Sequence, residues 1–88
     1  MYLLERRAVL QVITDKITPY VGATMAGAAA QVHCERLGIT DERVSAAQFE
    51  QLIKLIGSGL VIFIGPDQSK KVVDDIRATL VGGKGVMA

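Results

Sequence analysis

The sequence predicts an all-α protein: a compact bundle of four short helices, or five, around a central helix of small residues. Along most of the chain, apolar residues recur at the three- and four-residue spacing of an amphipathic helix. Glycine and proline fall at positions where helices begin or end. The run of eighteen residues from Ile17 to Cys34 contains no Asp, Glu, Lys or Arg, although 22% of the chain is charged.

The first helix is expected between Leu3 and Ile17. Its apolar positions have helical spacing: Leu3, Leu10, Ile13 and Ile17. Thr18 and Pro19 match an N-cap and a first-turn proline. The second helix is therefore predicted to begin there and to run to about Leu37.

The second helix coincides with the uncharged run. A helix without charge around its circumference needs cover on every side, so we expect it at the centre of the bundle. Gly22, Ala26 and Ala30 lie four residues apart and form a strip along which another backbone can approach closely. The neighbour is either another helix of this chain or a second copy, so these three residues are interface candidates. Gly38 supplies a left-handed residue for the C-terminal cap, and Ile39 is expected to fold back on the last turn.

The spacing of Ser45 and Gln48 matches a capping box, which predicts that the third helix begins at Ala46. Gly57 is the expected end of this helix. A fourth helix is predicted to open at Gly65-Pro66-Asp67, because proline is favoured in the first turn.

We expect residues 1–81 to form one helical domain and residues 82–88 to be a flexible C-terminal tail. No internal repeat is visible in the sequence.

The segment Leu60 to Ile64 consists of five consecutive apolar residues, LVIFI, between two glycines. This composition is typical of a buried strand, but no second run of this kind offers a partner within the chain. We therefore expect either a helical turn that continues the third helix after a glycine kink, or a strand that pairs with a second copy across a twofold axis. Under either interpretation the segment supplies interface candidates: Leu60, Val61, Ile62, Phe63 and Ile64.

The composition predicts self-association. The chain has 88 residues, of which 50% are apolar, and its mean hydropathy is +0.35. At this size, folding hides only about 60–65% of the surface of the unfolded chain. Some apolar surface is then left for a homodimer or a higher oligomer.

Residues with catalytic or ligand-binding chemistry are few. His33 and Cys34 are the single histidine and the single cysteine, and as neighbours they point about 100° apart on a helix. We therefore expect no catalytic residues, no bound metal and no cofactor. The basic residues are scattered, which argues against nucleic acid as a partner. Gly65 to Ser69 is the best candidate for a small anion, although capping by Asp67 or Ser69 explains this segment more simply.

The single cysteine and the charged N-terminal residues, which leave no room for a signal-peptide core, predict a cytoplasmic protein. The uncharged run is interrupted by polar residues, glycine and proline, so no membrane helix is expected. We expect a non-enzymatic interaction or oligomerisation module, an accessory or adaptor subunit that acts through an apolar surface. The alternatives are a small helical DNA-binding or regulatory protein and a ligand-binding protein with its site at a subunit interface.

Overall fold

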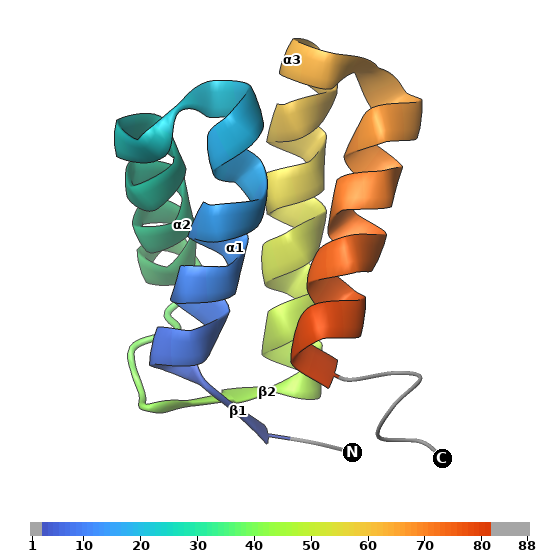
Figure 1. Ribbon diagram of the computed structural model, residues 1–88. Helices are drawn as coiled ribbons and strands as arrows, with labels where there is room; N and C mark the ends of the chain where they lie inside the picture. The colour runs from blue at the N-terminus through green and yellow to red at the C-terminus, as the bar shows by residue number, and fades with distance from the viewer. Residues whose placement is uncertain (1–2, 82–88) are drawn as a thin grey trace.

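A computed structural model describes residues 3–81, which are mostly helical (Figure 1). The elements in chain order are β1 (Leu3–Glu5), α1 (Arg6–Val21), α2 (Ala23–Arg36), β2 (Arg43–Ser45) and α3 (Ala46–Val81). The prediction of an all-α protein is confirmed. The predicted bundle of four or five helices is not, because the described residues form three helices and a small two-stranded sheet. The predicted tail, residues 82–88, lies outside the described residues.

The turn between α1 and α2 is made by Gly22, whose φ of 89° and ψ of 155° only glycine adopts readily. The prediction that Thr18 and Pro19 separate these helices was wrong, since both residues lie inside α1. Proline removes one backbone donor near the end of the helix, whereas the left-handed glycine turns the chain.

The helix α3 contains a sharp bend at Gly65, where φ is 82° and ψ is 166°. We call residues 46–64 the first arm and residues 66–81 the second arm. Figure 1 shows the chain reversing at this bend, so that the second arm returns beside the first. The expected end at Gly57 was wrong, because the first arm continues through Leu60 to Ile64, which are helical and do not form a strand.

Gly57 instead lies inside the first arm, at a close contact with the second arm. A Cβ atom placed on Gly57 would lie 3.0 Å from Cγ2 of Val73. The buried hydroxyl of Ser69 donates a hydrogen bond of 2.7 Å to the carbonyl of Gly57. The glycine is thus explained by packing between the arms.

The fold repeats the order strand, helix, left-handed glycine, helix, although the sequence shows no repeat. The strands β1 and β2 pair antiparallel with Leu4 opposite Val44. Five residues after these partners come Val9 and Phe49, both fully buried. Val9 and Phe49 thus fill related core positions with side chains of different size, so this position gives no sequence match between the two halves.

Two predicted caps are confirmed. At the end of α2, Gly38 has a φ of 72° and Ile39 N–H donates to the carbonyl of Cys34 at 2.8 Å, as in a Schellman motif. At the start of α3, Gln48 N–H donates to Oγ of Ser45 at 3.1 Å, and Ser45 N–H donates to Oε1 of Gln48 at 2.9 Å. These reciprocal bonds form the capping box.

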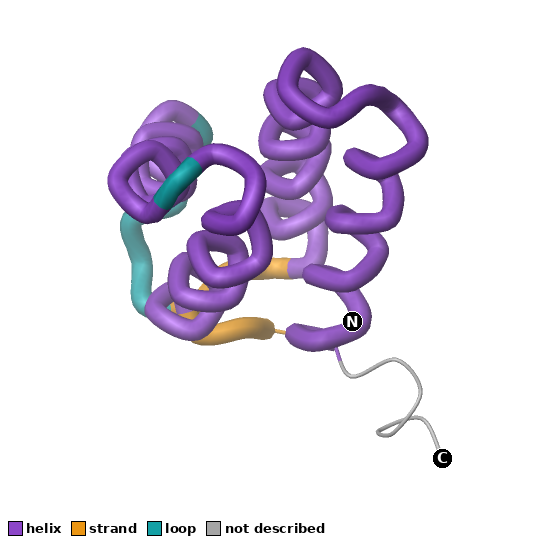
Figure 2. The backbone as a smooth tube through the Cα atoms, turned by 45° about the horizontal axis from the view of Figure 1, so that its top comes forward, coloured by secondary structure: helices purple, strands orange, loops and turns teal. Residues whose placement is uncertain are grey.

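The core lies between α1 and the first arm of α3, and α2 and the second arm cover it. The prediction that the small-residue helix lies at the centre of the bundle was wrong, because α2 buries only the side with Ala26, Ala30 and Cys34 and exposes the other to solvent. Figure 2 shows the α1–α2 pair beside the two arms, with the sheet beneath one end of both pairs. The buried apolar residues are Val9, Ile13, Ile17, Ala26, Ala30, Cys34, Ile39, Val44, Phe49, Leu52, Ile53, Ile56, Leu60, Val72 and Ile76.

Candidate functional site

The two longest uncharged stretches of the sequence meet at one end of the molecule. Ile17 to Cys34 and Leu55 to Pro66 contain no Asp, Glu, Lys or Arg. Figure 1 shows the α1–α2 turn and the bend of α3 at the same end, opposite the sheet. The two segments therefore combine into one uncharged region, although 20 residues separate them in the chain.

Large apolar side chains are exposed in this region. Ile62 is 84% exposed, Phe63 56% and Met25 50%. Val32 is also exposed and lies seven residues after Met25, on the same side of α2. We call Met25, Val32, Ile62 and Phe63, with the groove that Met25 and Phe63 help to line, the apolar face. Val61, the neighbour of Ile62 in the chain, is exposed as well.

A groove of about 170 Å³ runs between α2 and the first arm of α3. It is lined by Ile17, Val21, Met25, Ala29, His33, Ile56, Gly59, Leu60 and Phe63. Its walls are thus apolar except at His33. Exposed apolar surface of this kind marks interaction sites when it is contiguous.

His33 is the titratable residue of this groove. Its Nδ1 atom is enclosed and has no hydrogen-bond partner among the described residues. Burial and then the positive charge of Arg36 lower the pKa of His33, which favours the neutral imidazole. The side chain is therefore an uncharged wall of the groove at neutral pH.

The opposite side of the bundle, between α1 and the second arm, is joined by polar contacts. Nζ of Lys16 lies 3.0 Å from Oδ2 of Asp75. Nε2 of Gln68 donates to the hydroxyl of Tyr20 at 3.1 Å. In the repeated fold α1 corresponds to the first arm, and α2 corresponds to the second arm. The contact between α1 and the second arm therefore corresponds to the contact between the first arm and α2, where the groove lies. One side is thus closed by side chains of the same molecule, and the other exposes an apolar groove.

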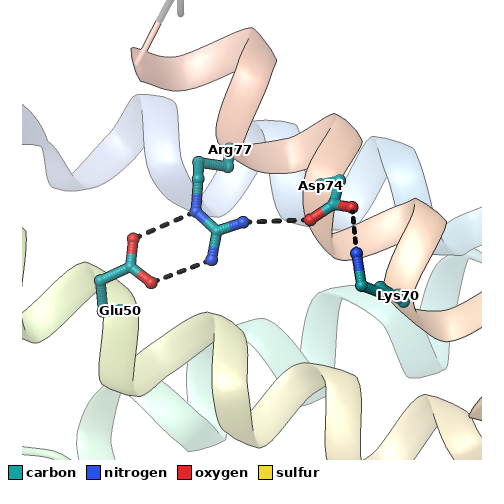
Figure 3. Close-up of polar contacts among 4 residues, drawn as sticks. All are labelled: Glu50, Lys70, Asp74 and Arg77. Atoms are coloured by element: carbon teal, nitrogen blue, oxygen red, sulfur yellow. Dashed lines mark hydrogen bonds and ion pairs between the residues drawn. The ribbon is translucent and has the colours of Figure 1, made fainter.

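Polar contacts also join the two arms of α3. Figure 3 shows the guanidinium of Arg77 between Glu50 and Asp74, with Lys70 on the far side of Asp74. Arg77 donates to Glu50 through Nε at 3.2 Å and Nη2 at 2.9 Å, and to Asp74 through Nη1 at 3.1 Å. Lys70 Nζ lies 3.2 Å from Asp74.

The bonds from Arg77 lower the pKa of Glu50, and those from Glu50 raise the pKa of Arg77. Because these side chains are about half exposed, each pair contributes only about 0–1 kcal/mol. The network bridges the two arms, and none of its four residues lines the groove.

The predicted interface residues fall into two groups. Val61, Ile62 and Phe63 are exposed, whereas Leu60 is buried and Ile64 half-buried. Ala26 and Ala30 are buried within this chain, and Gly22 is exposed at the turn.

Two residues of the apolar face, Met25 and Val32, were missed by the sequence reasoning. The signal that could have found them is their spacing of seven residues within the uncharged run, on the side of α2 away from Ala26 and Ala30.

The remaining candidates show no combined chemistry. Burial raises the pKa of the Cys34 thiol, which disfavours the reactive thiolate. The hydroxyl of Ser69, part of the candidate anion segment, is engaged with Gly57. Within residues 3–81, no three His, Cys, Asp or Glu side chains are grouped as a metal site would require.

A hollow of about 400 Å³ lies at the opposite end, beside the sheet. Its lining residues are Glu5, Arg6, Arg7, Thr40, Glu42 and Arg43. Two carboxylates lie among the three guanidinium groups, so an anion would meet both signs of charge. A second hollow, of about 390 Å³, includes Arg6, Arg7, Gln11 and Gln31. Both hollows are lined mainly by charged or polar side chains, unlike the groove between α2 and the first arm.

By length and composition alone, α3 is long and apolar enough to cross a membrane. However, the bend at Gly65 limits the straight first arm to residues 46–64. The inner side of this arm supplies five residues of the core, which are Phe49, Leu52, Ile53, Ile56 and Leu60. The first arm therefore contributes to the core of the bundle, and 28% of the most apolar 18-residue window of α3 is buried.

Comparison with known proteins gives no family assignment: the chain matches no family model, no curated protein and no solved structure.

Proposed function

We propose that this protein is a small, non-enzymatic interaction module that self-associates through the apolar face, as an accessory or adaptor subunit in the cytoplasm. The observation that carries this proposal is the exposure of Ile62, Phe63 and Met25, of which Phe63 and Met25 line one groove without charged residues. Burying apolar surface lowers the free energy by about 25 cal/mol per Å², and side chains that stay in water do not gain this stabilisation. Association with a second surface recovers this free energy.

The distribution of charge supports the same proposal. The sheet end carries Glu5, Arg6, Arg7, Glu42 and Arg43, which keep that end hydrated. The second arm carries the network of Arg77. Burying charged groups costs free energy, because they lose their solvation. A partner is therefore expected to dock on the apolar face and not on the charged regions around it.

The proposal is tested by placing a charge on the face. Ile62→Asp should dissociate the oligomer while leaving the fold intact, because this side chain is 84% exposed and supports little of the core. The measurement is solution mass by light scattering, with far-ultraviolet circular dichroism as the check on helix content.

The matched control is Thr40→Asp, which adds the same charge at an exposed position near the sheet. Thr40→Asp should keep the mass of the native protein. If both variants retain the native oligomer, association through the apolar face is refuted.

A further inference from the structure

The groove has the size of one large apolar side chain. Its volume is about 170 Å³, and a dry cavity of about 150 Å³ accommodates a benzene molecule. The α3 wall includes Gly59, which contributes no side chain, and a Cβ atom there would meet nothing within 4 Å. The groove is therefore open at Gly59.

A projecting side chain of the matching kind lies on the same helix. Ile62 follows Gly59 by three residues, so it lies beside the groove on the outer surface of the first arm. It is the most exposed large apolar residue among residues 4–81. The groove at Gly59 and the exposed side chain of Ile62 thus lie next to each other on the first arm.

This arrangement matches the requirement of a twofold dimer. In an isologous contact the same patch is used by both copies, so a patch that carries a hole and a matching projection can satisfy both at once. Identical copies also bring identical charges together, which is unfavourable by several kcal/mol when the charges face each other. The apolar face avoids this penalty, because Ile17 to Cys34 and Leu55 to Pro66 carry no charge.

We propose that the partner at the apolar face is a second copy of this chain, and that Ile62 of each copy enters the groove between α2 and α3 of the other. This inference rests on the proposed self-association and adds its geometry. Gly59 then serves to keep the groove open for the incoming side chain.

The test fills the groove without disturbing the fold. Gly59→Leu places a side chain in open space on a helix, where Leu is a better helix former than Gly. We expect Gly59→Leu to weaken dimerisation at least about tenfold, a large effect on the scale of binding free energies. The control Gly59→Ala adds only a methyl group and should dimerise within about threefold of the native chain, well under the tenfold step of 1.4 kcal/mol.

Cross-linking locates the contact. Ile62→Cys mixed with Ala29→Cys should give a disulfide between the two different variants, because residue 29 lines the groove and the native Cys34 is buried. A dimer that survives Gly59→Leu, or that cross-links only between two copies of Ile62→Cys, overturns the inference and leaves self-association standing.

Two other results would show that the partner at the apolar face is not a second copy of this chain. A native chain with a mass of 9.4 kDa at every concentration refutes both the inference and the proposed function. A monomer that floats with neutral phosphatidylcholine vesicles assigns the face to a membrane surface instead.

Discussion

Two glycines of α3, Gly57 and Gly59, lie two positions apart in the same helix and have opposite surroundings. A Cβ atom on Gly57 would lie 3.0 Å from Val73, whereas a Cβ atom on Gly59 would meet nothing within 4 Å. The first glycine lets the two arms of α3 pack closely, and the second leaves a gap in the surface. The composition around them is the same, so the sequence alone does not distinguish their roles.

This difference predicts opposite effects on stability. Gly59→Ala should raise the free energy of unfolding by about 0.5–1 kcal/mol, since alanine is the better helix former. Gly57→Ala should lower it, because overpacking against the stiff side chain of Val73 costs about 1–3 kcal/mol. Urea unfolding followed by circular dichroism compares the two variants at a concentration where neither associates. Equal stabilisation by both would show that the arms do not approach as closely as described.

His33 gives a pH dependence whose sign follows from its environment. Burial lowers its pKa in the folded state below the ordinary value of 6.5. The unfolded chain therefore takes up the proton first, so the stabilising contribution of this group is present above pH 6.5 and is lost as the pH falls toward the folded-state pKa. The free energy of unfolding should decrease between pH 7.5 and pH 5.5.

The variant His33→Gln isolates this effect, because it keeps a polar side chain that does not titrate. Urea unfolding of both proteins at several pH values is the measurement. The decrease should be smaller in His33→Gln than in the native chain. Identical slopes would show that the imidazole is not buried as described.

Among the elements, Gly22 and Gly65 occupy equivalent positions in the repeated fold: Gly22 joins α1 to α2, and Gly65 joins the two arms of α3. Their φ values of 89° and 82° lie where L-residues are strained. Gly22→Ala and Gly65→Ala should each lower the free energy of unfolding by about 1–3 kcal/mol. Gly27→Ala is the control, since Gly27 lies within α2 in open space and should tolerate the methyl group. The prediction fails if thermal unfolding gives the same midpoint for all three variants.

The sequence predicted the elements best where a local motif determines the backbone. Ser45 with Gln48 and Gly38 with Ile39 satisfy their caps through neighbouring residues, so spacing alone identified both. Pro19 was misread because proline is favoured in the first turn of a helix, whereas here it lies near the end of α1 and Gly22 makes the turn.

The short strands β1 and β2 escaped prediction for a physical reason. Each spans only three residues, and each is held by pairing with a segment about 40 residues away. A local pattern of three residues carries no such information. Gly57 was likewise taken as a helix end because its packing partner, Val73, lies in the returning arm.

For the whole molecule, composition predicted an apolar surplus but not its location. The exposed residues Val61, Ile62 and Phe63 were identified from their own segment. The contribution of Met25 and Val32 depends on how α2 packs beside the first arm, which is a property of the tertiary fold. Ala26 and Ala30 were predicted as interface candidates, but both are already buried within the single chain, which their own segment does not reveal.

The partition of charge is the principal feature at this scale. The groove between α2 and the first arm has no charged lining residue, whereas the sheet end is charged, and Lys16, Gln68 and Arg77 make polar contacts that join the second arm to the rest of the bundle. A molecule of this kind has one surface suited to burial against a partner. We therefore propose that its central property is association through that surface.

Solution mass measured by light scattering across a dilution series tests this claim most directly. The native chain should have a mass of about twice 9.4 kDa at high concentration and should approach 9.4 kDa on dilution. Ile62→Asp should remain at 9.4 kDa throughout the series. A native mass of 9.4 kDa at the highest concentration reached would contradict the account.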